Sequence, residues 1–105
     1  MCGLQCFAGV LEVLSQLTVV GKVNAEEFRR RFRAMKQCSG TYFIVVVEDL
    51  ATHRIVASAS AIVELKFIHA CGQVAHVEDV VVDSTYRGHR LGKAYVATRG
   101  VRLCV

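Results

Sequence analysis

The sequence predicts an α/β (α+β) domain in which two helices precede three antiparallel strands and a loop then opens a third helix. Apolar residues recur at helical spacing in the first third of the chain. Three runs rich in β-branched residues follow, joined by short polar links, and a glycine-punctuated segment comes after them. The 105 residues leave room for one domain. A composition of 53% hydrophobic and 21% charged residues excludes intrinsic disorder.

The first helix is predicted by one apolar face. Val10, Leu11, Leu14 and Leu17 recur at i, i+1, i+4 and i+7, which places them on one side of a helix. The pattern stops before Gly21, and glycine is a common helix breaker. We therefore expect a helix that ends in a loop between residues 18 and 21.

The second helix has a predicted start, an apolar stripe and a basic face. Asn24 is an N-cap candidate, and Glu27 three residues later completes a capping box. The stripe at i, i+4 and i+7 consists of Phe28, Phe32 and Met35, and the basic face of Arg29, Arg30, Arg31 and Arg33. The basic face is either a nucleic-acid or anion patch or a solvated helix face. We favour the solvated face and expect no nucleic-acid partner, because aromatic and basic residues do not alternate as in RNA-binding segments.

Three strands are predicted after a helix stop at residues 38–40. The β-branched and aromatic runs are Thr41–Glu48, Ile55–Leu65 and Val74–Val82, and the links between them are residues 49–54 and 69–73. Such short links favour antiparallel neighbours, because parallel strands need a longer crossover. The three strands therefore predict an antiparallel meander.

The five cysteines and the N-terminus bear on the cellular compartment. The cysteines are odd in number and irregularly spaced, which is typical of free thiols in a reducing compartment. A metal site built from Cys2, Cys6, His69 and Cys71 stays an alternative, but we expect no metal. The apolar start of the chain lacks a basic leader and is interrupted by Glu12, and no stretch is long enough to span a bilayer. We expect a cytoplasmic protein without a transmembrane segment, and peripheral attachment to endomembranes stays open.

The segment from Val77 to Lys93 (VEDVVVDSTYRGHRLGK) is a strand, a loop and the start of a helix. A glycine-containing loop that opens a helix presents free backbone N–H groups and the positive end of the helix dipole, which together favour a phosphate or pyrophosphate. Arg87, Arg90 and Lys93 add positive charge. The spacing fits neither a Walker A loop nor the dinucleotide-binding glycine pattern.

The sequence RGHRLG at residues 87–92 resembles the pyrophosphate loop of the GNAT superfamily of N-acetyltransferases, written Q/R-x-x-G-x-G/A. Arg87 and Gly92 match this pattern, whereas Arg90 stands where the middle glycine is usual. Within the superfamily, VLSQLTVVG, VVVED, KFIH and VEDVVV are similar to the glucosamine 6-phosphate N-acetyltransferase family over residues 9–93. The resemblance implies acetyl transfer from acetyl-CoA to the amine of D-glucosamine 6-phosphate. The product, N-acetyl-D-glucosamine 6-phosphate, leads to UDP-N-acetylglucosamine.

The resemblance also implies roles for individual residues. It makes Glu78 and Asp79 the catalytic carboxylates that contact the sugar, and a carboxylate there would orient the ammonium and take its proton. The implied substrate-binding residues are Thr18, Lys66, Phe67, Ile68, His69, Glu78, Asp79 and Val80. The implied acetyl-CoA-binding residues are Val80, Val81, Val82, Arg87, Gly88, His89, Arg90, Leu91 and Gly92. A strand N–H aimed at the thioester carbonyl would stabilise the oxyanion.

The sequence departs from the family pattern at both ends. The family has a strand before the first helix and a strand–helix–strand unit after the pyrophosphate helix. We therefore expect residues 1–105 to form a partial domain with a divergent tail at 94–105, and strand 74–82 to keep an apolar edge. A complete member would form a homodimer. The alternatives are a non-catalytic remnant, which binds CoA weakly or pairs with a full-length subunit, and an acetyltransferase for proteins or other amines, against which KFIH and VEDVVV argue.

Overall fold

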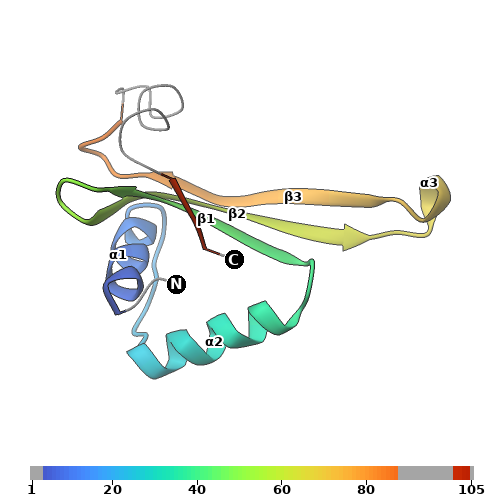
Figure 1. The fold of residues 1–105 in the computed structure, drawn as a ribbon, viewed down its shortest axis with the longest axis horizontal. Helices are drawn as coiled ribbons and strands as arrows, with labels where there is room; N and C mark the ends of the chain where they lie inside the picture. The colour runs from blue at the N-terminus through green and yellow to red at the C-terminus, as the bar shows by residue number, and fades with distance from the viewer. Residues whose placement is uncertain (1–3, 88–100, 105) are drawn as a thin grey trace.

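The protein folds as one antiparallel sheet with two helices packed on the same face (Figure 1). The computed structural model describes residues 4–87 and 101–104. The sheet order is β3-β2-β1-β4, and each pair of neighbouring strands is antiparallel. The elements in chain order are α1 (Leu4–Ser15), α2 (Ala25–Gln37), β1 (Tyr42–Asp49), β2 (Arg54–Leu65), α3 (Ile68–Cys71), β3 (Gln73–Val82) and β4 (Val101–Cys104). The predicted meander of three strands is confirmed.

The core lies where α1 packs on the sheet. Val13 of α1, Val46 of β1, Ile55 of β2 and Val81 of β3 form one buried cluster. Gly9 allows this close packing, because a Cβ atom at its position would lie 2.8 Å from Cγ1 of Ile55. One α-carbon without a side chain therefore sets how closely α1 approaches β2.

The first helix is displaced toward the N-terminus relative to the prediction. α1 already includes Leu4 and ends at Ser15, so the prediction that Leu17 lies on the helical face is wrong. The amides of Gln16 and Leu17 donate to Val13 and Leu14, which is the tighter i→i+3 turn common at helix ends. Leu17 leaves the packed face in this turn and is 45% exposed.

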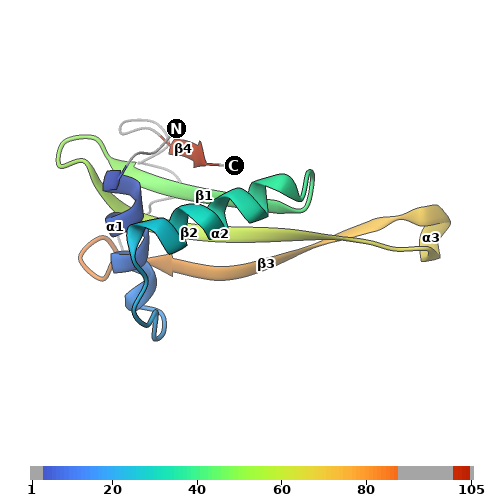
Figure 2. The ribbon, with the colours of Figure 1, turned by 90° about the horizontal axis from the view of Figure 1, so that it is seen from below.

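The second helix begins as predicted. The Asn24 side chain accepts from the Glu27 amide and the Glu27 carboxylate accepts from the Asn24 amide, both at 2.9 Å, so the capping box is confirmed. Its apolar stripe is only half-buried, and no residue of α2 is fully buried. Figure 2 shows α2 lying along the sheet on the side of α1. Phe28 is in edge-to-face contact with Phe7 of α1, with ring centroids 5.0 Å apart.

The two sheet edges differ from each other. The sequence analysis named three strands and none in the tail, but the structure has a fourth, β4, which pairs with β1 along residues Ile44–Val47. Strand pairing depends on a partner distant in sequence, and four residues carry too little pattern to reveal it. β3 forms the other edge within the described residues and exposes Val77 (68%) and Val80 (56%), which confirms the expected apolar edge.

Residues 4–87 contain no helix with the length and hydrophobicity needed to cross a bilayer. Cys38 and Cys71 are free and exposed, as expected of free thiols.

Candidate active site

One face of the β2–β3 hairpin carries a row of polar side chains. Residues directly opposite on neighbouring strands share a face, so the pairs Ser60↔Glu78, Ile62↔His76 and Glu64↔Val74 place Glu64, His76 and Glu78 together. Ser58 of β2 lies on the same face as Ser60, and it pairs with Val46 of β1 and Val81 of β3, which are both buried. The row therefore lies on the face that α1 and α2 cover further along the sheet.

Glu64 contacts two other polar side chains at this end of the hairpin, Lys66 and His76. Its Oε1 accepts from Lys66 Nζ at 3.0 Å, and its Oε2 lies 2.8 Å from Nε2 of His76. The hydrogen bond from Lys66, followed by that from His76, lowers the pKa of Glu64. Lys66, a predicted phosphate ligand, is thus oriented by a carboxylate two residues earlier on the same face. The sequence reasoning missed Glu64 and His76, although opposite charges at i and i+2 of a strand are a readable signal.

The predicted catalytic pair lies at a β-bulge in β3. Ser58 pairs with Val81 and Ser60 pairs with Glu78, so Asp79 and Val80 together oppose one residue of β2. Asp79 has φ of 51°, a left-handed conformation uncommon outside glycine. A bulge leaves backbone groups out of the ladder and redirects side chains, and bulges are frequent beside active sites. The backbone break therefore falls at the residues for which the resemblance implied contact with sugar and thioester.

The segment Lys66–His69 lies at the far tip of the hairpin (Figure 1). Its expected turn is the short α3, in which His69, Ala70 and Cys71 all have left-handed backbone. The Lys66 amide donates to Gly72 at 2.9 Å and closes the turn, while Phe67 is 96% exposed. Ser60 pairs with Glu78, and β2 ends five residues later at Leu65. The distance along the strand between these two levels is about 16 Å. Within one chain the structure does not bring the tip and the catalytic pair together.

The remaining predicted residues lie at the opposite end of the sheet. Thr18 is exposed just after α1, and its amide donates to Leu14. Arg87 is exposed beyond β3, and its Nε donates to the Val82 carbonyl at 2.9 Å. The loop residues 88–92 and the helix predicted to start near Lys93 lie outside the described residues.

A buried carboxylate that the sequence reasoning missed organises this end. Asp83 is 3% exposed and accepts four hydrogen bonds, from Gln16 Nε2 (2.8 Å), Arg54 Nη2 (3.4 Å), Thr85 N (2.9 Å) and Thr85 Oγ1 (2.6 Å). Hydrogen bonds from Thr85, then from Gln16, lower the pKa of Asp83. The signal that could have revealed Asp83 is in the adjacent sequence, because Asp followed by Ser and Thr favours a turn capped by the Asp side chain.

A second buried carboxylate supports the same segment. Asp49 is 2% exposed and accepts a hydrogen bond from the Tyr86 hydroxyl at 2.6 Å. The Ala51 amide donates to its other oxygen at 3.0 Å. The segment Asp83–Arg87 is therefore fixed from three sides, by α1, by the β1–β2 turn and by the end of β3.

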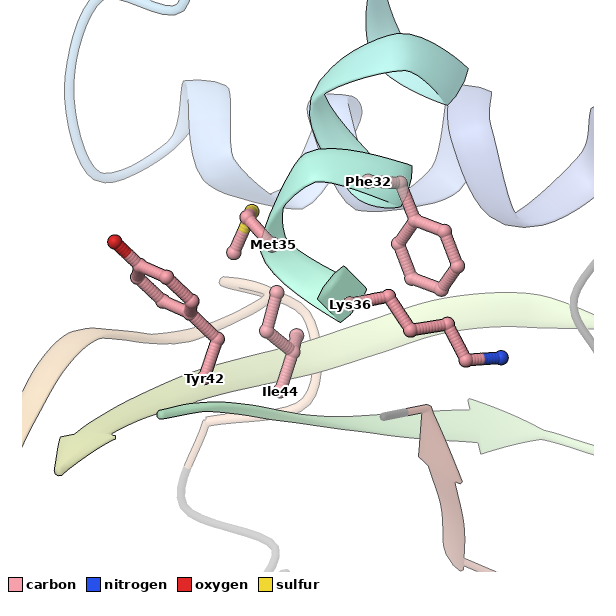
Figure 3. Close-up of a pocket in the computed structure, with 5 residues that line it drawn as sticks. All are labelled: Phe32, Met35, Lys36, Tyr42 and Ile44. Atoms are coloured by element: carbon pink, nitrogen blue, oxygen red, sulfur yellow. The ribbon is translucent and has the colours of Figure 1, made fainter. Parts of the chain in front are cut away.

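A small pocket between α2 and β1 contains none of the predicted site residues. It is lined by Phe32, Met35, Lys36, Tyr42 and Ile44 (Figure 3). Its lining is mainly apolar, and Lys36 Nζ lies 5.9 Å from the Phe32 ring centroid. Ile44 pairs with Ser60, which pairs with Glu78, so the pocket shares a face with Glu78 two strands away.

Two other predicted features can be placed. Arg29, Arg30 and Arg33 are exposed on α2, which fits a solvated helix face and an anion patch equally. Within residues 7–87 no three metal-ligating side chains come together. Cys2 and the side chain of Cys6 fall outside that part, so the alternative metal site stays a prediction.

Comparison with known proteins agrees with this arrangement. Residues 11–98 match the acetyltransferase (GNAT) family. A probable glucosamine 6-phosphate N-acetyltransferase of Drosophila melanogaster is 51% identical over 90 residues, which are 86% of this chain and 41% of that protein. Glucosamine 6-phosphate N-acetyltransferase of Arabidopsis thaliana is 46% identical over 88 residues, covering 84% of this chain and 59% of the relative. The chain thus spans about half the length of these relatives.

Solved structures give the same result for the fold. The crystal structure of the Arabidopsis thaliana glucosamine-6-phosphate N-acetyltransferase superimposes with a TM-score of 0.79 at 43% identity, covering 89% of this chain and 63% of that one. An acetyltransferase of Trypanosoma brucei gives a TM-score of 0.76 at 32% identity, with 91% and 66% covered. Sequence, strand order and these matches together show that the chain belongs to the GNAT acetyltransferase family.

Proposed function

We propose that this chain transfers the acetyl group of acetyl-CoA to the amine of D-glucosamine 6-phosphate. The observation that carries the proposal is the bulge at Asp79 and Val80, which interrupts the edge strand directly beside Glu78. The names of the relatives at 51% and 46% identity support the same substrate. The product would be N-acetyl-D-glucosamine 6-phosphate, a precursor of UDP-N-acetylglucosamine, and the protein would act in the cytoplasm.

The reaction assigns a role to each part of β3. The carboxylates of Glu78 and Asp79 orient the ammonium of the sugar and accept its proton, because only the neutral amine attacks the thioester. A backbone N–H at the bulge stabilises the oxyanion that forms on the thioester carbonyl. The new C–N bond replaces the C–S bond, and the leaving thiolate takes the second proton that the nitrogen loses as it becomes an amide, so CoA leaves as a thiol. No metal takes part.

Acetyl-CoA would lie along the end of β3. The backbone of Val80, Val81 and Val82 would hold its pantetheine arm beside the bulge. The pyrophosphate would lie against Arg87 and the loop at residues 88–92 (GHRLG). Arg87 supports this proposal, because its exposed guanidinium follows directly after the strand.

The sugar phosphate site would require two copies of the chain. Lys66 and His69 are proposed ligands of the phosphate, whose negative charge they would balance. They lie about 16 Å along the hairpin from the level of Glu78, which is longer than a hexose phosphate. The exposed apolar side chains of Phe67 and Ile68 at the tip also favour burial against another surface. A homodimer in which the tip of one copy completes the site of the other satisfies both observations.

The test is release of free thiol from acetyl-CoA on addition of glucosamine 6-phosphate to the purified chain. We expect release with this sugar, and strong reduction in Glu78→Gln. CoA binding without thiol release would favour the non-catalytic alternative, and release with a peptide amine instead of the sugar would favour another acceptor.

The cofactor assignment has a separate test with a matched control. Arg87→Ala should weaken CoA binding, whereas Arg29→Ala on the exposed face of α2 should leave the affinity unchanged. Equal affinities of the wild type and Arg87→Ala for CoA would show that the pyrophosphate assignment is wrong.

A further inference from the structure

The side chain of Gln16 bridges two segments that lie far apart in the sequence. Its Nε2 donates to Oδ2 of Asp83 at 2.8 Å, and its Oε1 accepts from the Ser84 amide at 2.9 Å. The nitrogen and the oxygen of one carboxamide thus each make a hydrogen bond, to residues 67 and 68 positions away in the sequence. No role follows for Gln16 from the family resemblance or from the sequence pattern.

On one side of this bridge, backbone hydrogen bonds hold both Gln16 and Thr18 to the last turn of α1. The Gln16 amide donates to Val13 at 3.2 Å, and the Thr18 amide donates to Leu14 at 3.2 Å. The turn after α1 is therefore a continuation of the helix end, and a displacement of Gln16 displaces Thr18 with it. Thr18 is the proposed sugar-binding residue of this turn.

On the other side, the bridge leads to Arg87 through an equally fixed turn. Asp83 donates its amide to Val56 at 2.7 Å and accepts from the Tyr86 amide at 2.9 Å. Tyr86 is held by Asp49, and Arg87 by the Val82 carbonyl. The path from Gln16 to Arg87 therefore runs through the hydrogen bond to Asp83 (2.8 Å), the hydrogen bond from the Tyr86 amide to the Asp83 carbonyl (2.9 Å) and the peptide bond from Tyr86 to Arg87.

We propose that Gln16 is a positioning residue that couples the sugar-binding turn at Thr18 to the CoA-binding turn at Arg87. This inference rests on the proposed function, because it takes both turns as ligand sites. A ligand that shifts one turn also shifts the other through the Gln16 carboxamide. Each ligand therefore binds more tightly when the other is present, and thermodynamic linkage makes the two effects equal.

The test measures this coupling directly in the chain of residues 1–105. CoA affinity is determined by calorimetry with and without saturating glucosamine 6-phosphate, for the wild type, Gln16→Ala and Gln16→Glu. Gln16→Glu keeps the shape and the acceptor for Ser84 but replaces the donor to Asp83. Gln37→Ala at the end of α2 is the matched control, because Gln37 is exposed and far from both turns in sequence.

We expect the sugar to tighten CoA binding at least about fivefold in the wild type and in Gln37→Ala. In both Gln16 variants the ratio should fall toward one. A purely structural role would lower the melting temperature of the variants and leave the ratio of the folded protein intact. If Gln16→Ala does not fold, Gln16→Glu carries the test.

Three outcomes would overturn the inference, and they can be told apart. Retention of the full ratio in the Gln16 variants would show that the coupling does not pass through Gln16. A wild type that binds CoA equally well with and without the sugar would show that no coupling exists, while the cofactor assignment survives. A wild type that binds neither CoA nor the sugar would overturn the proposed function and the coupling with it.

Discussion

The buried carboxylate of Asp83 provides the sharpest stability prediction. Asp83→Asn preserves the shape of the side chain and its acceptor for the two donors of Thr85. The amide NH2 then replaces Oδ2, which accepts from Gln16 at 2.8 Å and from Arg54 at 3.4 Å. Three donor groups would face one another at a site that is 3% exposed.

The size of the effect follows from these two contacts. A hydrogen bond to a charged group contributes about 1.5–3 kcal/mol, and the Arg54 contact is long and partly solvated. We expect Asp83→Asn to lower the free energy of unfolding by about 2–4 kcal/mol, a large part of the 5–15 kcal/mol typical of a domain. The measurement is equilibrium unfolding in urea at pH 7, with the exposed Glu26→Gln as control, for which we expect a change within about 0.5 kcal/mol.

The pH dependence gives an independent check. The hydrogen bonds from Thr85 and Gln16 put the pKa of Asp83 in the folded state below its ordinary value of 3.8. The stabilisation is therefore complete above that value and is lost as the pH falls through the lowered pKa. The difference between wild type and Asp83→Asn should shrink in strong acid. A loss below about 0.5 kcal/mol at pH 7, or a loss that is equal at pH 7 and in strong acid, would refute this reasoning.

Three further predictions test other parts of the structure. Gly9→Ala should destabilise the protein by about 1 kcal/mol in urea unfolding, because overpacking against Ile55 outweighs the gain in helix propensity; stabilisation would show that α1 does not pack this closely. Asn24→Ala should cost about 1 kcal/mol in the same assay through loss of the capping box, and an unchanged midpoint would contradict the cap. Lys66→Ala should raise the pKa of Glu64 toward its ordinary value in an NMR titration, and an unmoved pKa would show that the two side chains do not pair.

Local chemistry made much of the fold predictable. The capping box at Asn24 and the helix stop before Gly40 depend on residues within a few positions of one another, and both have the expected geometry. The three long strands could be predicted because each contains a long run of β-branched residues, which is stronger evidence than the propensity of any single residue. The short strand β4 was not, because only its pairing with β1 makes it a strand.

The residues of the proposed site were named from the sequence, but their arrangement could not be predicted. The sequence pointed to Glu78 and Asp79, yet the bulge at Asp79 and Val80 depends on the register against β2. The bridge from Gln16 to Asp83 spans 67 residues, so no local pattern reveals it. Hydrogen bonds between distant segments are set by tertiary packing, and they decide how the predicted residues are held.

The most direct test of the central claim, that the β3 bulge is the acetyl-CoA site, is a titration of the amide NMR spectrum with CoA. We expect saturable shifts that are largest from Asp79 to Val82 and at Arg87. Shifts centred instead on the arginines of α2, or no saturable shifts in β3, would contradict it.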